Sequence, residues 1–220
     1  TASNSTAVGT DALGANTTGS DNTALGYAAL RDNTTASNNT AVGYFALEAN
    51  TTGENMTAVG TNAGLSHTTG NSSTFIGTDS GKLTTTGVGN TFVGDGSGRQ
   101  NTTGTSNVAM GQSALLANTT ASSNTAVGTS ALQSNTTGDV NTALGSGALY
   151  ACTTSSANTA VGKDAGANIT TGGNNTAVGR SALVANTTGS ENTALGKDAG
   201  AGITSGASNV ALGFRSLYTS

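Results

Sequence analysis

The side chains that could do chemistry in this chain are few and lie far apart in the sequence. His67 is the single histidine and Cys152 the single cysteine of the 220 residues. A catalytic nucleophile needs a base within hydrogen-bonding reach, and this pattern supplies no such pair. One cysteine also allows no intramolecular disulfide. We interpret both residues as substituted structural positions and expect no enzyme.

Acidic residues recur at regular intervals without gathering. Asp11, Asp79, Asp164 and Asp198 share one position of a repeat, so they are spaced along the molecule. A calcium loop needs acidic residues that alternate within a short segment, and none is present. We therefore expect neither a metal site nor a cofactor, and the Lys-Asp pairs that end in Asp164 and Asp198 predict a solvated corner.

Asparagine precedes Thr-Thr at seven places and there forms the sequon for N-glycosylation. A repeat that contains N-T-T also creates this sequon automatically, so glycosylation and a purely structural role both stay open. The seven residues are Asn16, Asn33, Asn50, Asn101, Asn118, Asn135 and Asn186.

The Thr-Thr pairs raise an alternative function, ice binding. Regular threonine arrays on flat β-solenoids bind ice in several unrelated proteins. Adjacent residues of an extended chain point to opposite faces, so Thr17 and Thr18 contribute one outward column rather than two.

The element that must position these residues is a repeat of seventeen residues. Thirteen glycines hold one phase with no insertion or deletion, and a short fixed period indicates a stacked-repeat architecture. They are Gly9, Gly26, Gly43, Gly60, Gly77, Gly94, Gly111, Gly128, Gly145, Gly162, Gly179, Gly196 and Gly213. We number the repeat from this glycine as position zero, and the consensus from −4 onward is N-T-A-V-G-x-x-A-L-x-x-N-T-T-G-x-x.

This repeat predicts an all-β fold, a parallel β-solenoid with one coil per repeat and about 13 coils. Seventeen residues are too few for two packed helices, and glycine and threonine are weak helix formers. Each short strand should pair with its copy one coil along. A coil spacing of about 4.8 Å then gives a rod about 60 Å long.

Alternation within the strand assigns the faces of each coil. Positions −3 and −1 share one face and −2 takes the other. We expect the aliphatic residue at −1 to form the core, the asparagine at −4 to stack as a ladder, and the glycine to turn the corner. The small residues at −2 and +3 suit a close approach between chains, which favours a homotrimer.

Substitutions in the repeat compensate for one another. Leu at +4 usually accompanies Asn at +7, whereas Gly166 at +4 accompanies Ile169 at +7. Phe75 and Phe92 likewise replace alanine in repeats that have glycine at +4. Core volume is thus conserved while its source moves. The coil around Asp95–Gln100 has little to bury and should be the softest.

Composition and charge exclude several classes of function. Charged residues are 8 % of the chain and the net charge is −4, with no basic patch for nucleic acid. No apolar run is long enough for membrane insertion. Residues 1–220 begin and end inside a repeat, so we expect a single uncapped array that is a segment of a longer fibrous protein.

Two known families share parts of this pattern. Asn107–Gly111 and Asn209–Gly213 resemble the N-x-V-A-I-G repeat of trimeric autotransporter adhesin heads, which are left-handed parallel β-rolls. The full phrase N-T-A-V-G-x-x-A-L-x-x-N-T-T-G is more similar to arrays in bacteriophage tail-fibre-like proteins, upstream of an endosialidase-type chaperone domain. The resemblance covers the whole chain and implies a fibre exposed on a virion or cell surface.

The leading expectation is therefore a non-enzymatic, extracellular structural shaft or adhesin region that forms a homo-oligomer. A self-assembling filament is a second structural alternative. Contact with a host receptor or glycan would fall on aromatic residues at the variable positions, which could equally pack between chains. These residues are Tyr27, Tyr44, Phe45, Tyr150, Phe214 and Tyr218.

Overall fold

The computed structural model describes residues 3–218 and shows a β-solenoid in which each repeat forms one coil. Each coil has one three-residue strand, and turns form the rest. Within residues 3–218 there is no helix that could cross a membrane. The strands are β1 (Thr6–Val8), β2 (Thr23–Leu25), β3 (Thr40–Val42), β4 (Thr57–Val59), β5 (Thr74–Ile76), β6 (Thr91–Val93), β7 (Val108–Met110), β8 (Thr125–Val127), β9 (Thr142–Leu144), β10 (Thr159–Val161), β11 (Thr176–Val178), β12 (Thr193–Leu195) and β13 (Val210–Leu212).

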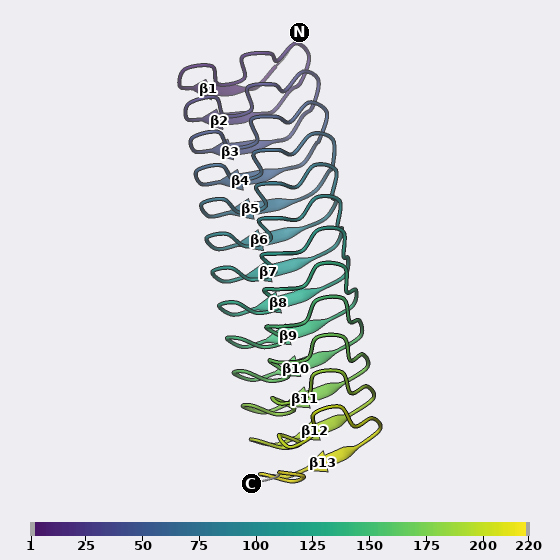
Figure 1. The fold of residues 1–220 in the computed structure, drawn as a ribbon. Helices are drawn as coiled ribbons and strands as arrows, with labels where there is room; N and C mark the ends of the chain where they lie inside the picture. Colours follow the sequence, from purple (N-terminus) through teal and green to yellow (C-terminus); the bar gives the residue numbers. More distant parts are fainter. Residues whose placement is uncertain (1–2, 219–220) are drawn as a thin grey trace.

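The thirteen strands form one parallel sheet whose order is the order of the chain. Each strand pairs in register with the strand of the next coil, as Thr23 does with Thr40 and Ala24 with Ala41. Figure 1 shows the strands stacked as a ladder along a rod, with the two ends of the chain at opposite ends. The predicted fold class is confirmed.

The glycine at position zero turns the chain directly after each strand. All thirteen glycines from Gly9 to Gly213 have a positive φ, which reaches 142° at Gly43. A Cβ on Gly26 would collide with the carbonyl oxygen of Gly43 in the next coil. Glycine alone combines this conformation with such close stacking, in agreement with its predicted place at the corner.

Two more positions bend the chain in the left-handed region even where they are not glycine. Asp11 and Asn62 at +2 have φ values of 58° and 56°, which short polar residues tolerate. Leu30 at +4 has a φ of 51°, which is strained for leucine. Burial of its side chain and a 3.0 Å hydrogen bond from its N–H to the Ala46 carbonyl hold it there.

The interior of each coil is narrow and consists mainly of small residues. In the second coil Ala24 at −2, Ala29 at +3 and Leu30 at +4 are fully buried. The alanine at −2 belongs to the strand, while the residues at +3 and +4 belong to the turn that follows the glycine. These three positions recur as one continuous core along the rod.

The aliphatic residues at −1 lie on the outside, which corrects their predicted place in the core. Leu25 is 46 % exposed and Leu195 is 47 % exposed. The alternation along the strand was correct, but the faces were reversed. Because +3 and +4 already fill the interior from the opposite wall, only a small side chain at −2 fits between them and the sheet.

The enclosed alanines also remove the basis of the predicted trimer. The residues at −2 and +3 were expected to allow close approach between chains. From the second to the twelfth coil they are buried inside the coil, as Ala41 and Ala46 are, and present no surface to a neighbouring chain.

The compensating substitutions are confirmed in the core. A Cβ on Gly64 would lie 2.6 Å from the ring of Phe75, and a Cβ on Gly98 would lie 2.5 Å from the ring of Phe92. A Cβ on Gly166 would lie 2.9 Å from Cδ1 of Ile169. The larger residue in each case occupies the volume that Leu fills in other coils.

Candidate functional surfaces

The asparagines at −4 form a buried ladder along the rod, as predicted. Oδ1 of Asn90 accepts the backbone N–H of Asn107 at 3.0 Å and its Nδ2 at 3.2 Å. Nδ2 of Asn107 also donates to the Ala121 carbonyl at 2.8 Å. Each asparagine therefore satisfies main-chain groups of neighbouring segments in addition to its own amide.

The asparagines of the seven sequons form a second buried ladder at +7. Nδ2 of Asn118 donates to Oδ1 of Asn101 at 2.7 Å and to the Ala121 carbonyl at 3.0 Å. Six of the seven are fully buried, and Asn16 in the first coil is partly buried. A glycan would have to replace an Nδ2 hydrogen inside the coil, so the burial of these asparagines in the folded rod favours the structural role of the two that the sequence left open.

His67 and Cys152 occupy rungs of the +7 ladder, five coils apart. His67 is fully buried with Nδ1 3.4 Å from Oδ1 of Asn50, and its Nε2 has no hydrogen-bond partner among residues 3–218. Burial lowers the pKa of His67 to about 4, although the backbone of Gly87 opposes the shift. The structure thus places both residues where asparagine usually lies, as expected for substituted structural positions.

The Cys152 thiol is enclosed and has polar neighbours within its own coil. Its Sγ lies 3.1 Å from Oγ of Ser155 and is fully buried. Burial raises the pKa of the thiol, and the hydrogen bonds with Ser155 partly offset this. A buried thiol with a raised pKa is a poor nucleophile.

The recurrent acidic residues at +2 follow from the backbone conformation. Asp79, Asp164 and Asp198 all have a positive φ, like Asp11. Each of these three forms ion pairs with nearby cations, the shortest at 3.1 Å between Asp79 and Nζ of Lys82. Residues 3–218 contain no group of three His, Cys, Asp or Glu side chains that could hold a metal ion.

Asp79 is the most connected of these carboxylates. Partial burial raises its pKa, but hydrogen bonds from Asn62 and Lys82 and the charges of Lys82 and Arg99 lower it more, so the net shift is downward. A hollow of about 410 Å³ lies beside this group, lined by Lys82, Leu83, Arg99, Gln100, Thr102 and Thr119. Both of its cations pair with Asp79, so the hollow has little charge left for an anion.

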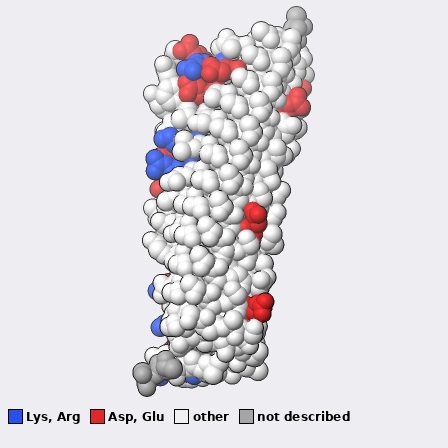
Figure 2. Space-filling model, turned by 45° about the vertical axis from the view of Figure 1, so that its right-hand side comes forward, with Lys and Arg blue, Asp and Glu red and all other residues white. Residues whose placement is uncertain are grey.

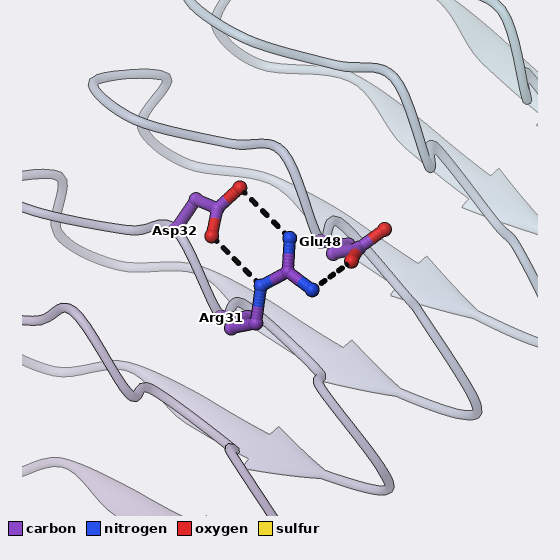
Figure 3. A network of polar contacts seen from close by, with 3 residues as sticks. All are labelled: Arg31, Asp32 and Glu48. Atoms are coloured by element: carbon purple, nitrogen blue, oxygen red, sulfur yellow. Dashed lines mark hydrogen bonds and ion pairs between the residues drawn. The ribbon is translucent and has the colours of Figure 1, made fainter.

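A second charged cluster joins two coils near the N-terminal end. Figure 3 shows Arg31 between Asp32 and Glu48, with Nε 2.9 Å from Oδ1 of Asp32 and Nη1 2.5 Å from Oε1 of Glu48. Figure 2 shows charges gathered in small groups on an otherwise uncharged surface. Sequence reasoning missed this cluster, although Arg31 and Glu48 occupy the same repeat position one coil apart.

The structure brings three of the six predicted contact aromatics together. Tyr27 and Tyr44 stack with ring centroids 5.3 Å apart, and Phe45 lies edge-on to Tyr44 at 4.2 Å. Because the stacked rings belong to successive coils, their faces point along the rod and their edges point outward. This arrangement suits packing between coils better than stacking on a sugar ring.

The other three aromatics lie elsewhere on the surface. Tyr150 is exposed on the turn after β9. Near the C-terminal end, the Arg215 guanidinium lies 5.2 Å from the ring centroid of Phe214 and 5.0 Å from that of Tyr218. Within 3–218, the six residues therefore form two groups and one isolated side chain, not one continuous site.

The threonines at +8 and +9 differ in their environment. Oγ1 of Thr17 donates to the Thr34 carbonyl at 2.9 Å, and Thr102 does the same to Thr119. The next threonine of each pair is exposed, as Thr18 and Thr103 are. Each pair thus gives one freely exposed column of threonines, as the alternation predicts.

The largest surface feature was not predicted at all. The outer side of the sheet carries two columns, the residues at −3, which are threonine or valine, and those at −1, which are valine, leucine, isoleucine or methionine. We call this surface the Thr/aliphatic face. It runs through all thirteen coils and contains no charged side chain. The signal in the sequence was the compensation between −2 and +4. Phenylalanine replaces alanine at −2 only in repeats with glycine at +4, which places −2 in the interior and −3 and −1 on the outside.

Comparison of the chain with known protein families, with curated proteins and with solved structures found no match.

Proposed function

We propose that the chain is a non-catalytic structural rod, the shaft or adhesin region of an extracellular fibre on a virion or cell surface. The observation that supports this most directly is the unbroken register of thirteen coils. Repeat arrays of this kind behave as quasi-one-dimensional bodies in which each unit contacts only its neighbours. The chain's similarity to repeats of tail-fibre-like proteins and adhesin heads points to the same role.

The contacts between coils favour a stiff spacer. Strand pairing links every pair of neighbouring coils, and turn residues add main-chain hydrogen bonds, such as Leu47 N–H to the Ala63 carbonyl at 3.0 Å. The two asparagine ladders lock the interior to the same register. Such a rod holds whatever is attached at one end at a fixed distance from the other end.

The spacer function predicts one narrow end-to-end distance. Spin labels on Asn38 and Asn174, which are both exposed, are eight coils apart and should be separated by about 40 Å. Pulsed electron resonance should give a single narrow distribution. A broad distribution, or one that shifts with mild changes in solvent, would contradict a rigid rod.

Ice binding is the alternative that the threonine columns offer. The +8 hydroxyls donate to main-chain carbonyls, which leaves the +9 hydroxyls as a single free column in this part of the coil. Thermal hysteresis of the purified chain tests the alternative, and its absence at high protein concentration would remove it. A self-assembling filament is the other alternative, and light scattering would reveal it as growth without a defined mass.

A further inference from the structure

We propose that two copies of this chain pack face to face through the Thr/aliphatic face. The pair would be a sandwich of two parallel sheets that run the length of both rods. This inference goes beyond the proposed function, since a single rod would also serve as a spacer.

The face is apolar to a degree that needs an explanation. Val8, Leu25, Ile76 and Met110 have exposed fractions of 54, 46, 38 and 44 %, although their strands are regular and paired. Soluble monomers rarely expose a continuous apolar surface of this extent, and larger ones mark interaction sites. An aliphatic residue stands at −1 in every coil and is exposed or half-buried in each, so the surface extends along the whole ladder.

The area matches what a stable pair of proteins needs. Thirteen coils at about 4.8 Å give a length of about 60 Å, and the two columns with their side chains span about 13 Å along the strand direction. The width is measured along the strand direction and the length along the rod, and their product is roughly 800 Å² for each copy, which is the share of one partner in a standard interface.

The spacing of the face favours a second copy over other partners. The face repeats its residues thirteen times at a constant spacing. Only a surface with the same spacing can match it along its whole length, and a second copy of the chain has that spacing. The −1 column varies between Val93, Met110 and Leu144 in size, so it presents an uneven ridge. Side chains of unequal length interdigitate with those of a facing sheet, whereas an ice lattice requires a uniform plane.

One flat face also determines the number of copies. A patch that contacts its own copy is self-complementary, and a two-fold axis closes the assembly at two. The remaining exposed columns are mostly polar, with Thr at +9 and mainly Asn, Ser, Asp or Glu at −5. No second apolar column is present among the described residues to build a three-fold assembly.

Mass in solution is the first test. The chain has a mass of 21.1 kDa, so sedimentation equilibrium should give twice that value. Three substitutions at −1 in the middle of the rod, Val93→Lys, Met110→Lys and Val127→Lys, should convert the pair to single chains. The matched control carries Thr103→Lys, Thr120→Lys and Thr137→Lys, which add the same charge to the exposed +9 column of the same three coils. Circular dichroism establishes that both variants keep the fold.

Crosslinking gives a second test that does not depend on destabilising the pair. Met110 lies in β7, the middle strand of thirteen, so it lies at the same height along the rod as its own copy whether the two rods run parallel in register or antiparallel about the centre. In a Cys152→Ser background, Met110→Cys should form a covalent dimer on mild oxidation, and Thr103→Cys should not.

Several results would overturn the proposal. They are a wild-type mass of one or three chains, an unchanged pair in the Val93/Met110/Val127 lysine variant, and equal crosslinking of the two cysteine variants. Thermal hysteresis from a single-chain species would assign the face to ice instead and would equally refute it.

Discussion

Oδ1 of Asn90 accepts two hydrogen bonds from Asn107 in the next coil, one from the backbone N–H and one from the side-chain amide. The side chain therefore serves as an acceptor for the main chain of its neighbour. The same contact recurs from Asn107 to Asn124, at 3.0 Å from the backbone N–H. Adjacent coils are thus joined through their interiors as well as through the sheet.

Asn107→Ala should lower the free energy of unfolding by about 2–3 kcal/mol, because it leaves the buried N–H of Asn124 without an acceptor. Urea denaturation followed by circular dichroism measures the change. Asn168→Ala is the matched control, since Asn168 is exposed and should change stability by less than about 0.5 kcal/mol. Equal effects of the two substitutions would show that the ladder contributes nothing specific.

Phe75 and Gly81 should be energetically coupled, because the Phe75 ring fills the space beside Gly81. Phe75→Ala alone should cost about 3–5 kcal/mol through the cavity it leaves. Gly81→Leu alone should also destabilise, since the ring blocks its side chain. The double variant restores the alanine and leucine of the consensus and should cost clearly less than the sum. Strict additivity in this double-mutant cycle would contradict the compensation.

Protonation of His67 should make the rod less stable in mild acid. The pKa is about 4 in the folded chain and 6.5 as the ordinary value, so between these pH values the unfolded chain binds a proton that the folded chain does not. The free energy of unfolding should therefore keep its full value above pH 6.5 and fall by about 3 kcal/mol as the pH drops to 4. Below pH 4 the titration of His67 should lower it no further.

His67→Asn restores the usual rung and removes the titrating group. The difference in unfolding free energy between the wild-type chain and this variant should grow from pH 7 to pH 4.5 in urea titrations. A difference that stays constant over this range would show that His67 is not buried as a neutral side chain.

The coil that contains Asp95–Gln100 should be the least protected against hydrogen exchange. Gly96 and Gly98 lose more conformational entropy on folding than other residues would, and Phe92 is the only fully buried large side chain of this coil. Its amides do bond to neighbouring coils, as Gly98 N–H does to Ala114 at 2.9 Å, so exchange reports local opening. Peptides over 95–100 should exchange faster than those over 112–117. Equal rates would refute the prediction.

Much of the architecture could be predicted from the sequence because the repeat is strict. The spacing from Gly26 to Gly43 sets one coil, and parallel pairing with a ladder at −4 follows from the stacking of identical positions. Where Gly166 replaces the usual leucine at +4, Ile169 replaces the usual asparagine at +7. This paired change also indicated that +4 and +7 share one interior volume. These inferences need only the pattern, since each compares a residue with its own copies.

The inferences that failed depended on the width of the coil interior, which the repeat pattern does not reveal. Alternation separates Ala24 from Leu25, but it does not tell which of them faces inward. Leu25 is more hydrophobic, and the interior is nevertheless too narrow to take it in addition to Leu30. Whether Asn50 is accessible for a glycan, and where Tyr27 points, depend on the same dimension. The compensation between −2 and +4 would have helped, since phenylalanine replaces alanine at −2 only where +4 is glycine, which places −2 in the interior.

The joint between coils is built from the same main-chain and asparagine groups at almost every step. A coil that offers the acceptor seen in Asn90 can therefore be followed by any coil that offers the donors seen in Asn107 at the same position. Unequal recombination between repeats in the gene can therefore add or remove whole coils without creating a new contact. The length of such a rod is free to evolve in steps of about 4.8 Å, independently of the sequence that forms each step.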